Sequence, residues 1–201
     1  MTTLKTNKVT LTLAARPFAI RNERASDVVA REALLDVCFG RGRQARTCQR
    51  LRDGRAPAEG LALSAVRQGK LVGTVRLWHV AAGGRAALVL GPLAVDPAFR
   101  ELGIGGALMR HAIAQARRLG HEAVVLLGDV PYYARFGFSA ETAAALALPG
   151  PFERHRLLAL ELRPGALEGA AGLVVATGTR AQDADLPRRG RRLRQLTATV
   201  A

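Results

Sequence analysis

The stretch Leu-Ala-Val-Asp-Pro-Ala-Phe-Arg-Glu-Leu-Gly-Ile-Gly-Gly-Ala-Leu, residues 93–108, decides the fold of this chain. Apolar residues from position 86 lead into it and predict a strand that ends near Val95. The apolar residues that follow at helical spacing are Ile104, Ala107, Leu108, Ala112, Ala116 and Leu119. The pattern therefore predicts a strand, a turn and a helix that begins among glycines.

Three glycines, Gly103, Gly105 and Gly106, lie where the predicted helix begins. Because glycine has no Cβ, a ligand can approach the backbone amides closely there. The first amides of a helix have no partner within it and lie at the positive end of its dipole, so a phosphate binds well at this place. Arg100 can add a planar, permanently charged guanidinium. The predicted phosphate-binding residues are Arg100, Glu101, Leu102, Gly103, Ile104, Gly105 and Gly106.

Other interpretations of these glycines fit less well. A dinucleotide-binding fingerprint needs a third glycine where Leu108 stands, and a P-loop needs Gly-Lys followed by Ser or Thr, which this stretch lacks. The alternative that stays open is a glycine-rich turn that binds no ligand.

The pattern Arg100-x-x-Gly103-x-Gly105 resembles the acyl-CoA signature of the GNAT superfamily of N-acetyltransferases. Downstream, Tyr133 stands four residues before a Gly-Phe pair, which is similar to the second motif of that family. With Gly-Pro-Leu-Ala-Val before the signature and Gly-Asp before the tyrosines, the chain looks closest to the YhbS-like branch of bacterial GNATs. The resemblance covers roughly residues 17–178.

The resemblance implies a mixed α/β domain at residues 17–178, with a twisted sheet of about six or seven strands flanked by helices. Residues 1–16 are predicted to be flexible, and the basic residues 179–201 are predicted to be disordered. Helices are predicted at 28–39, 44–52, 103–119 and 131–136, and strands at 18–24, 61–67, 71–80, 86–95, 123–127, 155–162 and 173–176. The residues of the first helix expected to face the core are Ala30, Leu34, Val37 and Cys38.

Pro92 lies inside the strand that leads into the signature. Because proline cannot donate to a ladder, we predict a bulge or a break in pairing there, which frees backbone groups of Leu93 and Val95. In the resembled family the strands separate at this point, and the pantetheine arm of the coenzyme lies in the gap. The resemblance therefore places this arm against Leu93, Ala94 and Val95. It implies acetyl-CoA as co-substrate and an amine, small or on a protein, as acceptor.

An amine that attacks a thioester needs a base for its proton, a donor for the oxyanion and a proton or hydrogen bond for the leaving thiolate. The N–H of Leu93, freed beside Pro92, is the candidate oxyanion donor. The resemblance makes Tyr133 the candidate general acid. The alternative for Tyr133 is a structural role, with its hydroxyl bonded to the backbone, and Tyr132 is a rival that fits the motif less well.

The general base is not evident from the sequence. Many GNATs carry a glutamate on the strand before the signature, but this strand has no carboxylate. Asp129 is the first candidate and His79 the second, although each fits equally well a turn-capping aspartate and a histidine on the surface of a strand. Deprotonation through a chain of water molecules needs neither residue.

The 201 residues carry a formal net charge of +14. Arginines gather at 41–55 and 188–194 with no interleaved aromatic residues, so we predict no specific nucleic-acid binding. A generally basic surface explains most of the excess, and its field would steer the anionic coenzyme inward. The cluster members Arg43, Arg46 and Arg50 hint at an acidic acceptor.

Cys38 and Cys48 are too few and too isolated for a disulfide framework or a zinc site, so we predict no bound metal and a reducing cytoplasm. No apolar run approaches the ~20 residues of a membrane span, and residues 1–15 lack the pattern of a signal peptide. We expect a monomer or a homodimer. Two other functions stay open, a noncatalytic acyl-CoA sensor on the same fold and a basic nucleic-acid-associated protein.

Overall fold

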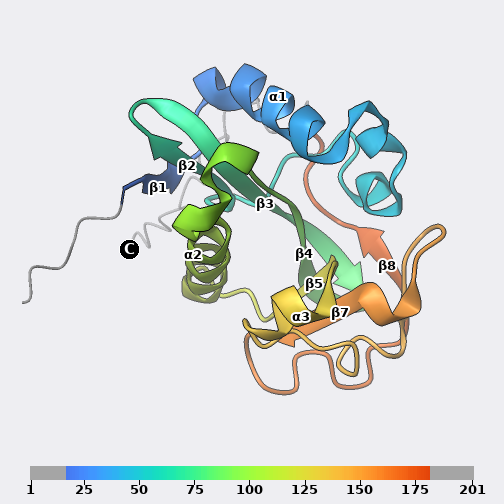
Figure 1. Ribbon diagram of the computed structural model, residues 1–201. Coiled ribbons are helices and arrows are strands. Elements are labelled where there is room, and N and C mark those ends of the chain that lie inside the picture. Colours follow the sequence, from blue (N-terminus) through green and yellow to red (C-terminus); the bar gives the residue numbers. More distant parts are fainter. Residues whose placement is uncertain (1–16, 182–201) are drawn as a thin grey trace, which may run out of the picture.

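The computed structural model describes residues 17–181, which form one sheet with helices on both of its faces (Figure 1). The predicted flexible segment 1–16 lies outside these residues, and so does the predicted tail from residue 182 onward. Residues 179–181, which the prediction assigned to that tail, are described, and Arg180 forms an isolated β-bridge with Arg55.

Eight strands make up the sheet in the described part of the chain. They are β1 (Ala19–Asn22), β2 (Ala62–Arg67), β3 (Lys70–Ala82), β4 (Arg85–Val95), β5 (Ala123–Leu127), β6 (Leu146–Ala147), β7 (Leu157–Glu161) and β8 (Gly172–Ala176). The main order is β1-β2-β3-β4-β5-β7, with β8 on β3 and β6 on β8. Only the pairs β4–β5 and β6–β8 are parallel. The predicted mixed α/β class is confirmed. The sheet has one strand more than the predicted maximum of seven, and the additional strand is the two-residue β6.

Three α-helices and five short 3₁₀ helices accompany the sheet between residues 17 and 181. The α-helices are α1 (Val28–Phe39), α2 (Ile104–Arg118) and α3 (Val130–Ala134). The 3₁₀ helices are η1 (Ala25–Asp27), η2 (Arg41–Ala45), η3 (Thr47–Leu51), η4 (Pro97–Leu102) and η5 (Arg154–Arg156). The predicted helix at 44–52 is wrong, because the extended backbone of Arg46 separates η2 from η3.

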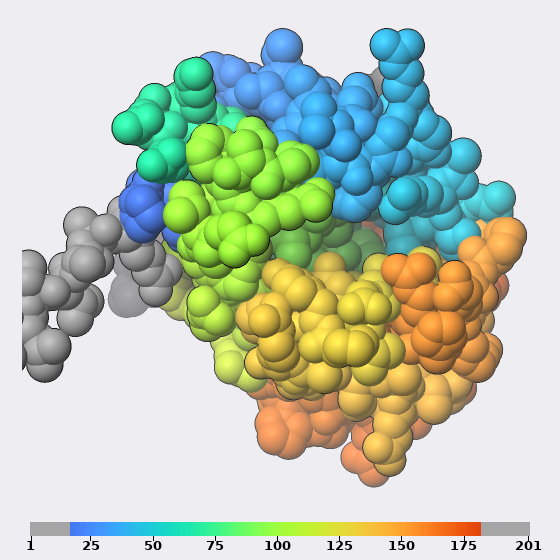
Figure 2. Space-filling model, viewed as in Figure 1, coloured from blue at the N-terminus to red at the C-terminus, as the bar shows by residue number. Residues whose placement is uncertain are grey.

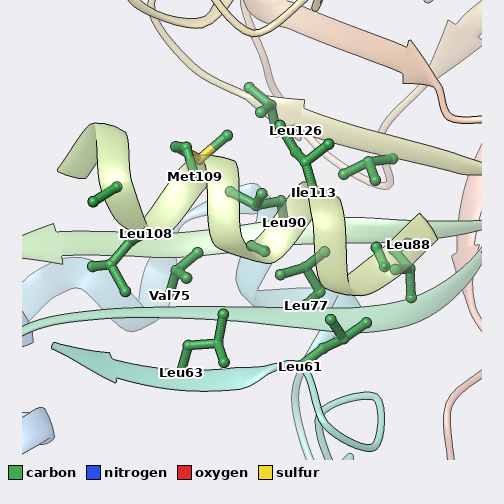
Figure 3. Packing of buried hydrophobic residues seen from close by; sticks show 14 of the residues in the cluster. Leu61, Leu63, Val75, Leu77, Leu88, Leu90, Leu108, Met109, Ile113 and Leu126 are labelled. Atoms are coloured by element: carbon green, nitrogen blue, oxygen red, sulfur yellow. The ribbon is translucent and has the colours of Figure 1, made fainter. Parts of the chain in front are cut away.

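Side chains of the strands alternate between two buried clusters on opposite faces of the sheet, as the two-residue period of a strand requires. On β4, Leu88 and Leu90 pack under α2, whereas Ala87 and Val89 belong to the cluster on the other face. In Figure 3 the apolar side of α2 lies over leucines of β2, β3 and β4. Burial of this apolar surface supplies the main favourable contribution to folding.

The predicted break around Pro92 is confirmed. The register between β3 and β4 shifts between Val75 and Leu77, opposite Gly91 and Pro92, as in a β-bulge. The ladder between β4 and β5 covers Leu88 and its neighbour alone, so the second half of β4 has no strand partner on that side. The two strands therefore part at the point that the sequence predicted.

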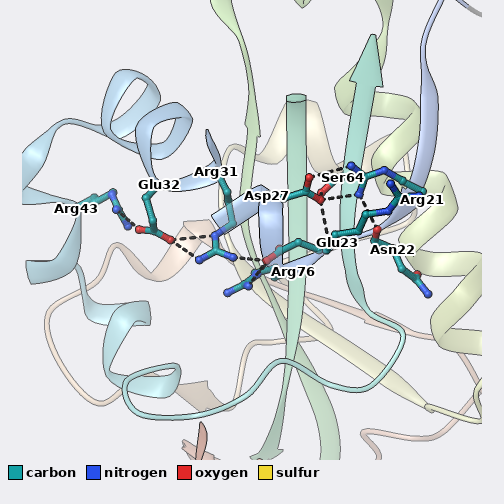
Figure 4. A network of polar contacts seen from close by, with 10 residues as sticks. Arg21, Asn22, Glu23, Asp27, Arg31, Glu32, Arg43, Ser64 and Arg76 are labelled. Atoms are coloured by element: carbon teal, nitrogen blue, oxygen red, sulfur yellow. Dashed lines mark hydrogen bonds and ion pairs between the residues drawn. The ribbon is translucent and has the colours of Figure 1, made fainter. Parts of the chain in front are cut away.

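A chain of ion pairs runs beneath α1 (Figure 4). Glu23 pairs with both Arg31 and Arg76, and Glu32 joins Arg31 to Arg43. The side chains of Arg31 and Glu23 are only 8% and 6% exposed, so each charge depends on its partner. The ion pairs tie α1 to β3 and to η2.

The predicted core face of α1 is partly wrong. Leu34 is buried as predicted, but Ala30 and Val37 are exposed, and Arg31 and Leu35 are buried instead. The cause is a buried charge, which hydrophobic periodicity does not detect, because the ion pairs described above let an arginine occupy the inner face.

Candidate active site

A cavity of about 1170 Å³ lies where β4 and β5 part. It is lined by the second half of β4, by η2 and η3, by Arg100 of η4 and by the segments 127–133 and 151–156. Figure 2 shows the hollow between these segments, with green atoms of β4 at its floor. The lining comes from several separate parts of the chain, so the cavity is a product of the tertiary fold.

The backbone of β4 turns two amide groups toward this gap. The N–H of Asp96 donates to the carbonyl oxygen of Val72 in β3 at 2.9 Å. Because successive residues of a strand direct their amide groups to opposite sides, Ala94 also faces β3. Leu93 and Val95, which alternate with them, therefore direct their amide groups into the gap.

The start of α2 lies beside Tyr132, a residue of the cavity lining, although no residue of α2 itself lines the cavity. Gly103 has a φ of 68°, a left-handed conformation that suits glycine, and no side chain within residues 17–181 caps the amides that follow it. A Cβ added at Gly105 would lie 2.8 Å from the hydroxyl oxygen of Tyr132, and one at Gly106 would lie 3.5 Å from the Arg110 guanidinium. A side chain at Gly105 would therefore displace the Tyr132 hydroxyl, which lies beside the first amides of α2.

The other predicted phosphate ligands differ in exposure. Arg100 is exposed at the edge of the cavity, and its guanidinium forms no ion pair with a carboxylate among the described residues. The side chains of Glu101 and Leu102 are exposed on η4, whereas the side chain of Ile104 is fully buried under α2. Ile104 can therefore offer a ligand its amide but not its side chain.

Tyr133 lines the cavity and packs its ring over Gly128, where an added Cβ would overlap the ring. Burial is the main reason that the pKa of Tyr133 is raised to about 12, and the neighbouring Tyr132 and Asp129 contribute in the same direction. The hydroxyl forms no hydrogen bond to the backbone between residues 17 and 181, so the structural alternative lacks the bond that it requires. At neutral pH the phenol keeps its proton and can donate it.

Tyr132, the rival tyrosine, has a different environment. Its ring meets that of Tyr133 edge to face, with centroids 4.9 Å apart, and the Arg135 guanidinium lies 4.5 Å from its centroid on the other side. Its hydroxyl points to Gly105 at the start of α2. The two adjacent tyrosines thus serve different ends of the cavity.

Two carboxylates line the cavity. Glu153 forms ion pairs with His155 at 3.6 Å and with Arg156 at 3.7 Å. Asp129 is exposed and forms no ion pair among the residues that the structure describes. His79, the second candidate base, is not part of the cavity lining.

The cavity lining is rich in arginine. The arginines that line it are Arg43, Arg46, Arg52, Arg100 and Arg156. Arg50 is not among them, because its Nη1 donates to the carbonyl oxygen of Pro149 at 2.7 Å. The sequence shows the basic cluster at 41–55 but not which of its members point into the cavity. Sequence reasoning therefore did not identify Arg52, or the distant Arg156, as cavity-lining residues.

Two further findings concern the described residues alone. Between residues 17 and 181, no group of three or more His, Cys, Asp or Glu side chains could hold a metal ion. In the same range no helix has the length and apolar character needed to cross a membrane.

Comparison with known proteins agrees with this geometry. Residues 29–138 match the model of the acetyltransferase (GNAT) family. The N-acetyltransferase YhbS of Escherichia coli K12, described as uncharacterized, is 31% identical over 157 residues, which is 77% of this chain and 93% of that protein. YjhQ of the same strain, described in the same words, is 31% identical over 59% of this chain and 68% of its own length. The chain therefore belongs to the GNAT family, and its class is that of the acyltransferases.

Two solved structures resemble the fold closely. E. coli YhbS in complex with CoA matches with a TM-score of 0.70 and 30% identity over 81% of this chain and 91% of that one. A GNAT acetyltransferase of Brucella melitensis in complex with acetyl-CoA matches with a TM-score of 0.53 and 32% identity over 73% of this chain and 97% of that one. The predicted family and its YhbS-like branch are confirmed.

Proposed function

We propose that the protein transfers the acetyl group of acetyl-CoA to the nitrogen of an amine. The observation that carries this proposal is the gap between β4 and β5, into which Leu93 and Val95 direct their amide groups, together with the start of α2, which no side chain of residues 17–181 caps. The similarity to two proteins solved with CoA or acetyl-CoA supports it. On this proposal the pantetheine arm lies against residues 93–95, and the diphosphate lies against residues 100–106.

The proposed reaction is a direct attack. The amine nitrogen attacks the carbonyl carbon of the thioester, and the N–H of Leu93 donates to the oxyanion that forms. The carbon–sulfur bond then breaks, and sulfur leaves with the electron pair. Tyr133 donates a hydrogen bond to this sulfur. Because its pKa of about 12 is well above that of a thiol, ~8.5, the phenol is expected to stabilise the thiolate mainly without complete proton transfer.

Asp129 is the proposed acceptor of the amine proton, directly or through water. It is a carboxylate of the cavity lining with no ion pair among residues 17–181, and it lies at the start of the element that carries Tyr133. β4 itself offers no carboxylate for this task. A carboxylate beside the cavity can remove the proton as the new carbon–nitrogen bond forms.

The test is a screen of primary amines with acetyl-CoA, in which release of free thiol is followed. Turnover of at least one amine, above the rate of hydrolysis without amine, is expected. Tight CoA binding with no turnover on any amine would instead favour the noncatalytic acyl-CoA sensor.

A further inference from the structure

One part of the cavity lies beyond the proposed thioester position. Arg52, which follows η3, directs Nη1 toward Gly91 in the bulge of β4, 3.8 Å from the place where a Cβ would stand. Gly91 lies two residues before Leu93, the proposed oxyanion donor. With the thioester placed beside Leu93 as proposed, the Arg52 guanidinium lies near the reacting carbonyl.

The charges at this end of the cavity are unequally matched. Arg43 pairs with Glu32 and with Asp36, the latter at 2.8 Å. Arg46 lies over the Phe39 ring at 5.2 Å and has no carboxylate partner in the described chain. The lining therefore holds positive charge that acidic groups between residues 17 and 181 do not balance.

The side chain of Arg52 makes one hydrogen bond within the described residues. Its Nε donates to the carbonyl oxygen of Cys48 at 3.2 Å, and no carboxylate of residues 17–181 lies within ion-pair distance. Burial is the main reason that the pKa of Arg52 is lowered; among the nearby charges, Cys48 and Asp53 raise it, whereas Arg43 and Arg46 lower it. A guanidinium nevertheless stays charged near neutral pH, and this half-buried one faces the cavity without a carboxylate at ion-pair distance among residues 17–181, so an anion in the cavity would compensate its charge.

We propose that the acceptor is an amine that also carries an anionic oxygen group, and that Arg52 binds this group. The inference rests on the proposed acetyl transfer. The coenzyme does not supply the anion, because its phosphates lie at the opposite end of the molecule from the thioester, where Arg100 and α2 receive them. A carboxylate or a phosphate of the acceptor would form charge-assisted hydrogen bonds with the planar guanidinium.

The same arginines would assist the reaction in a second way. Positive charges close to a bound ammonium group disfavour its charged form and lower its pKa. The acceptor nitrogen then loses its proton more readily, in a site whose β4 strand has no carboxylate. Anion binding and amine activation would come from one cluster.

Calorimetry on the CoA-saturated full chain tests this proposal, with inorganic phosphate and β-alanine as probes that carry an anionic oxygen group and β-alaninamide as the match that keeps the amine but lacks the carboxylate. At least one of the two anionic probes is expected to bind. β-Alaninamide is expected to bind at least tenfold more weakly than that probe. Arg52→Gln should weaken binding of the anionic probe at least tenfold, because a charge-assisted hydrogen bond is lost. The affinity of this variant for CoA should stay within twofold of that of wild type. The two anionic probes distinguish a carboxylate from a phosphate.

Two further variants keep the test decisive. Arg50→Gln removes a neighbouring exposed arginine outside the lining and should leave anion binding unchanged. Arg52→Lys keeps the charge without the planar fork and should lie between wild type and Arg52→Gln. If neither anionic probe binds to the CoA-loaded protein, the inference is wrong. It is also wrong if Arg52→Gln and Arg52→Lys both bind the anionic probe with the affinity of wild type. If CoA itself does not bind, the proposed function is wrong instead.

Discussion

The two ends of the cavity are built differently. The proposed coenzyme end consists of contiguous chain, from the second half of β4 through η4 to the start of α2, and offers mainly backbone amides; residues 90–93 and Arg100 are the part of it that lines the cavity. The acceptor end joins η2 and η3 to residues 151–156 and presents mainly side chains. Every residue except proline carries a backbone N–H, whereas the side chains of the acceptor end come from segments that only the tertiary fold brings together. The comparison explains why the coenzyme can be inferred from a sequence motif and the acceptor cannot.

The largest expected effect lies at the coenzyme end. Gly105→Glu places a carboxylate in front of the α2 amides, where it excludes and repels a phosphate, so CoA affinity should fall by a hundredfold or more. Isothermal titration calorimetry measures this loss. Ala114→Glu adds the same charge at an exposed position of the same helix and should bind CoA normally. Normal CoA affinity in Gly105→Glu would remove the backbone site from the account.

The next effect concerns proton removal between the two ends. Asp129→Asn keeps the size of the side chain but cannot accept the amine proton, so kcat should fall about a hundredfold with CoA affinity unchanged. The kcat of the variant should recover in part at alkaline pH, where more of the free amine is neutral. A pH profile of kcat with the same size and shape as wild type would exclude Asp129 as the base.

Replacement of Tyr133 should lower kcat somewhat less than replacement of Asp129, because Tyr133 stabilises a thiolate and a thiolate is already a good leaving group. Tyr133→Phe is expected to lower kcat by tenfold to a hundredfold, roughly the low end for acid–base catalysis. Since burial raises the pKa of Tyr133 to about 12, the wild-type kcat should not decline near pH ~10, where an ordinary tyrosine ionises. A wild-type decline at that pH that is absent from Tyr133→Phe would contradict the buried phenol.

The smallest expected effect is on stability, and it concerns a residue that lies outside the cavity. The Asp27 carboxylate accepts from Arg21 at 2.6 Å and from the Ser64 hydroxyl at 3.1 Å, and these bonds hold its pKa well below the usual range. Asp27→Asn should lower the free energy of unfolding by about 2 kcal/mol at pH 7. Turnover by the folded variant should be unaffected, because Asp27 does not line the cavity.

The sign of the pH effect follows from the lowered pKa. The unfolded chain binds the Asp27 proton near pH ~4, whereas the folded protein resists protonation, so this contribution is present above that pH and is lost as pH falls further. Urea denaturation should therefore show a difference between wild type and Asp27→Asn that shrinks from pH 7 to pH 3. A difference that does not depend on pH would show that the carboxylate charge is not the cause.

The sequence predicted those parts of the fold that depend on local patterns. The helix at 28–39 and the strand at 123–127 have the predicted bounds, and the proline in β4 marked the point where the sheet opens. Patterns of this kind arise from short-range spacing, which the sequence states directly. The same argument covers the family, whereas the location of the coenzyme end stays a prediction.

The remaining features depend on partners that are distant in the sequence. The inward position of Arg31 depends on Glu23, and the position of Arg52 depends on how η3 meets the β4 bulge. The predicted helix at 44–52 is wrong because short basic segments of this kind take their conformation from tertiary contacts, such as the bond from Arg50 to the Pro149 carbonyl. The acceptor end could therefore not be derived from spacing or composition.

Amide hydrogen exchange with and without saturating CoA tests the central claim most directly, because it observes the backbone groups themselves. Exchange at residues 93–95 and 103–106 should slow at least tenfold when CoA is bound, while amides of η2 and η3 change little. Saturation by CoA with no protection at either segment, or with protection confined to η2 and η3, would contradict the backbone-built coenzyme site.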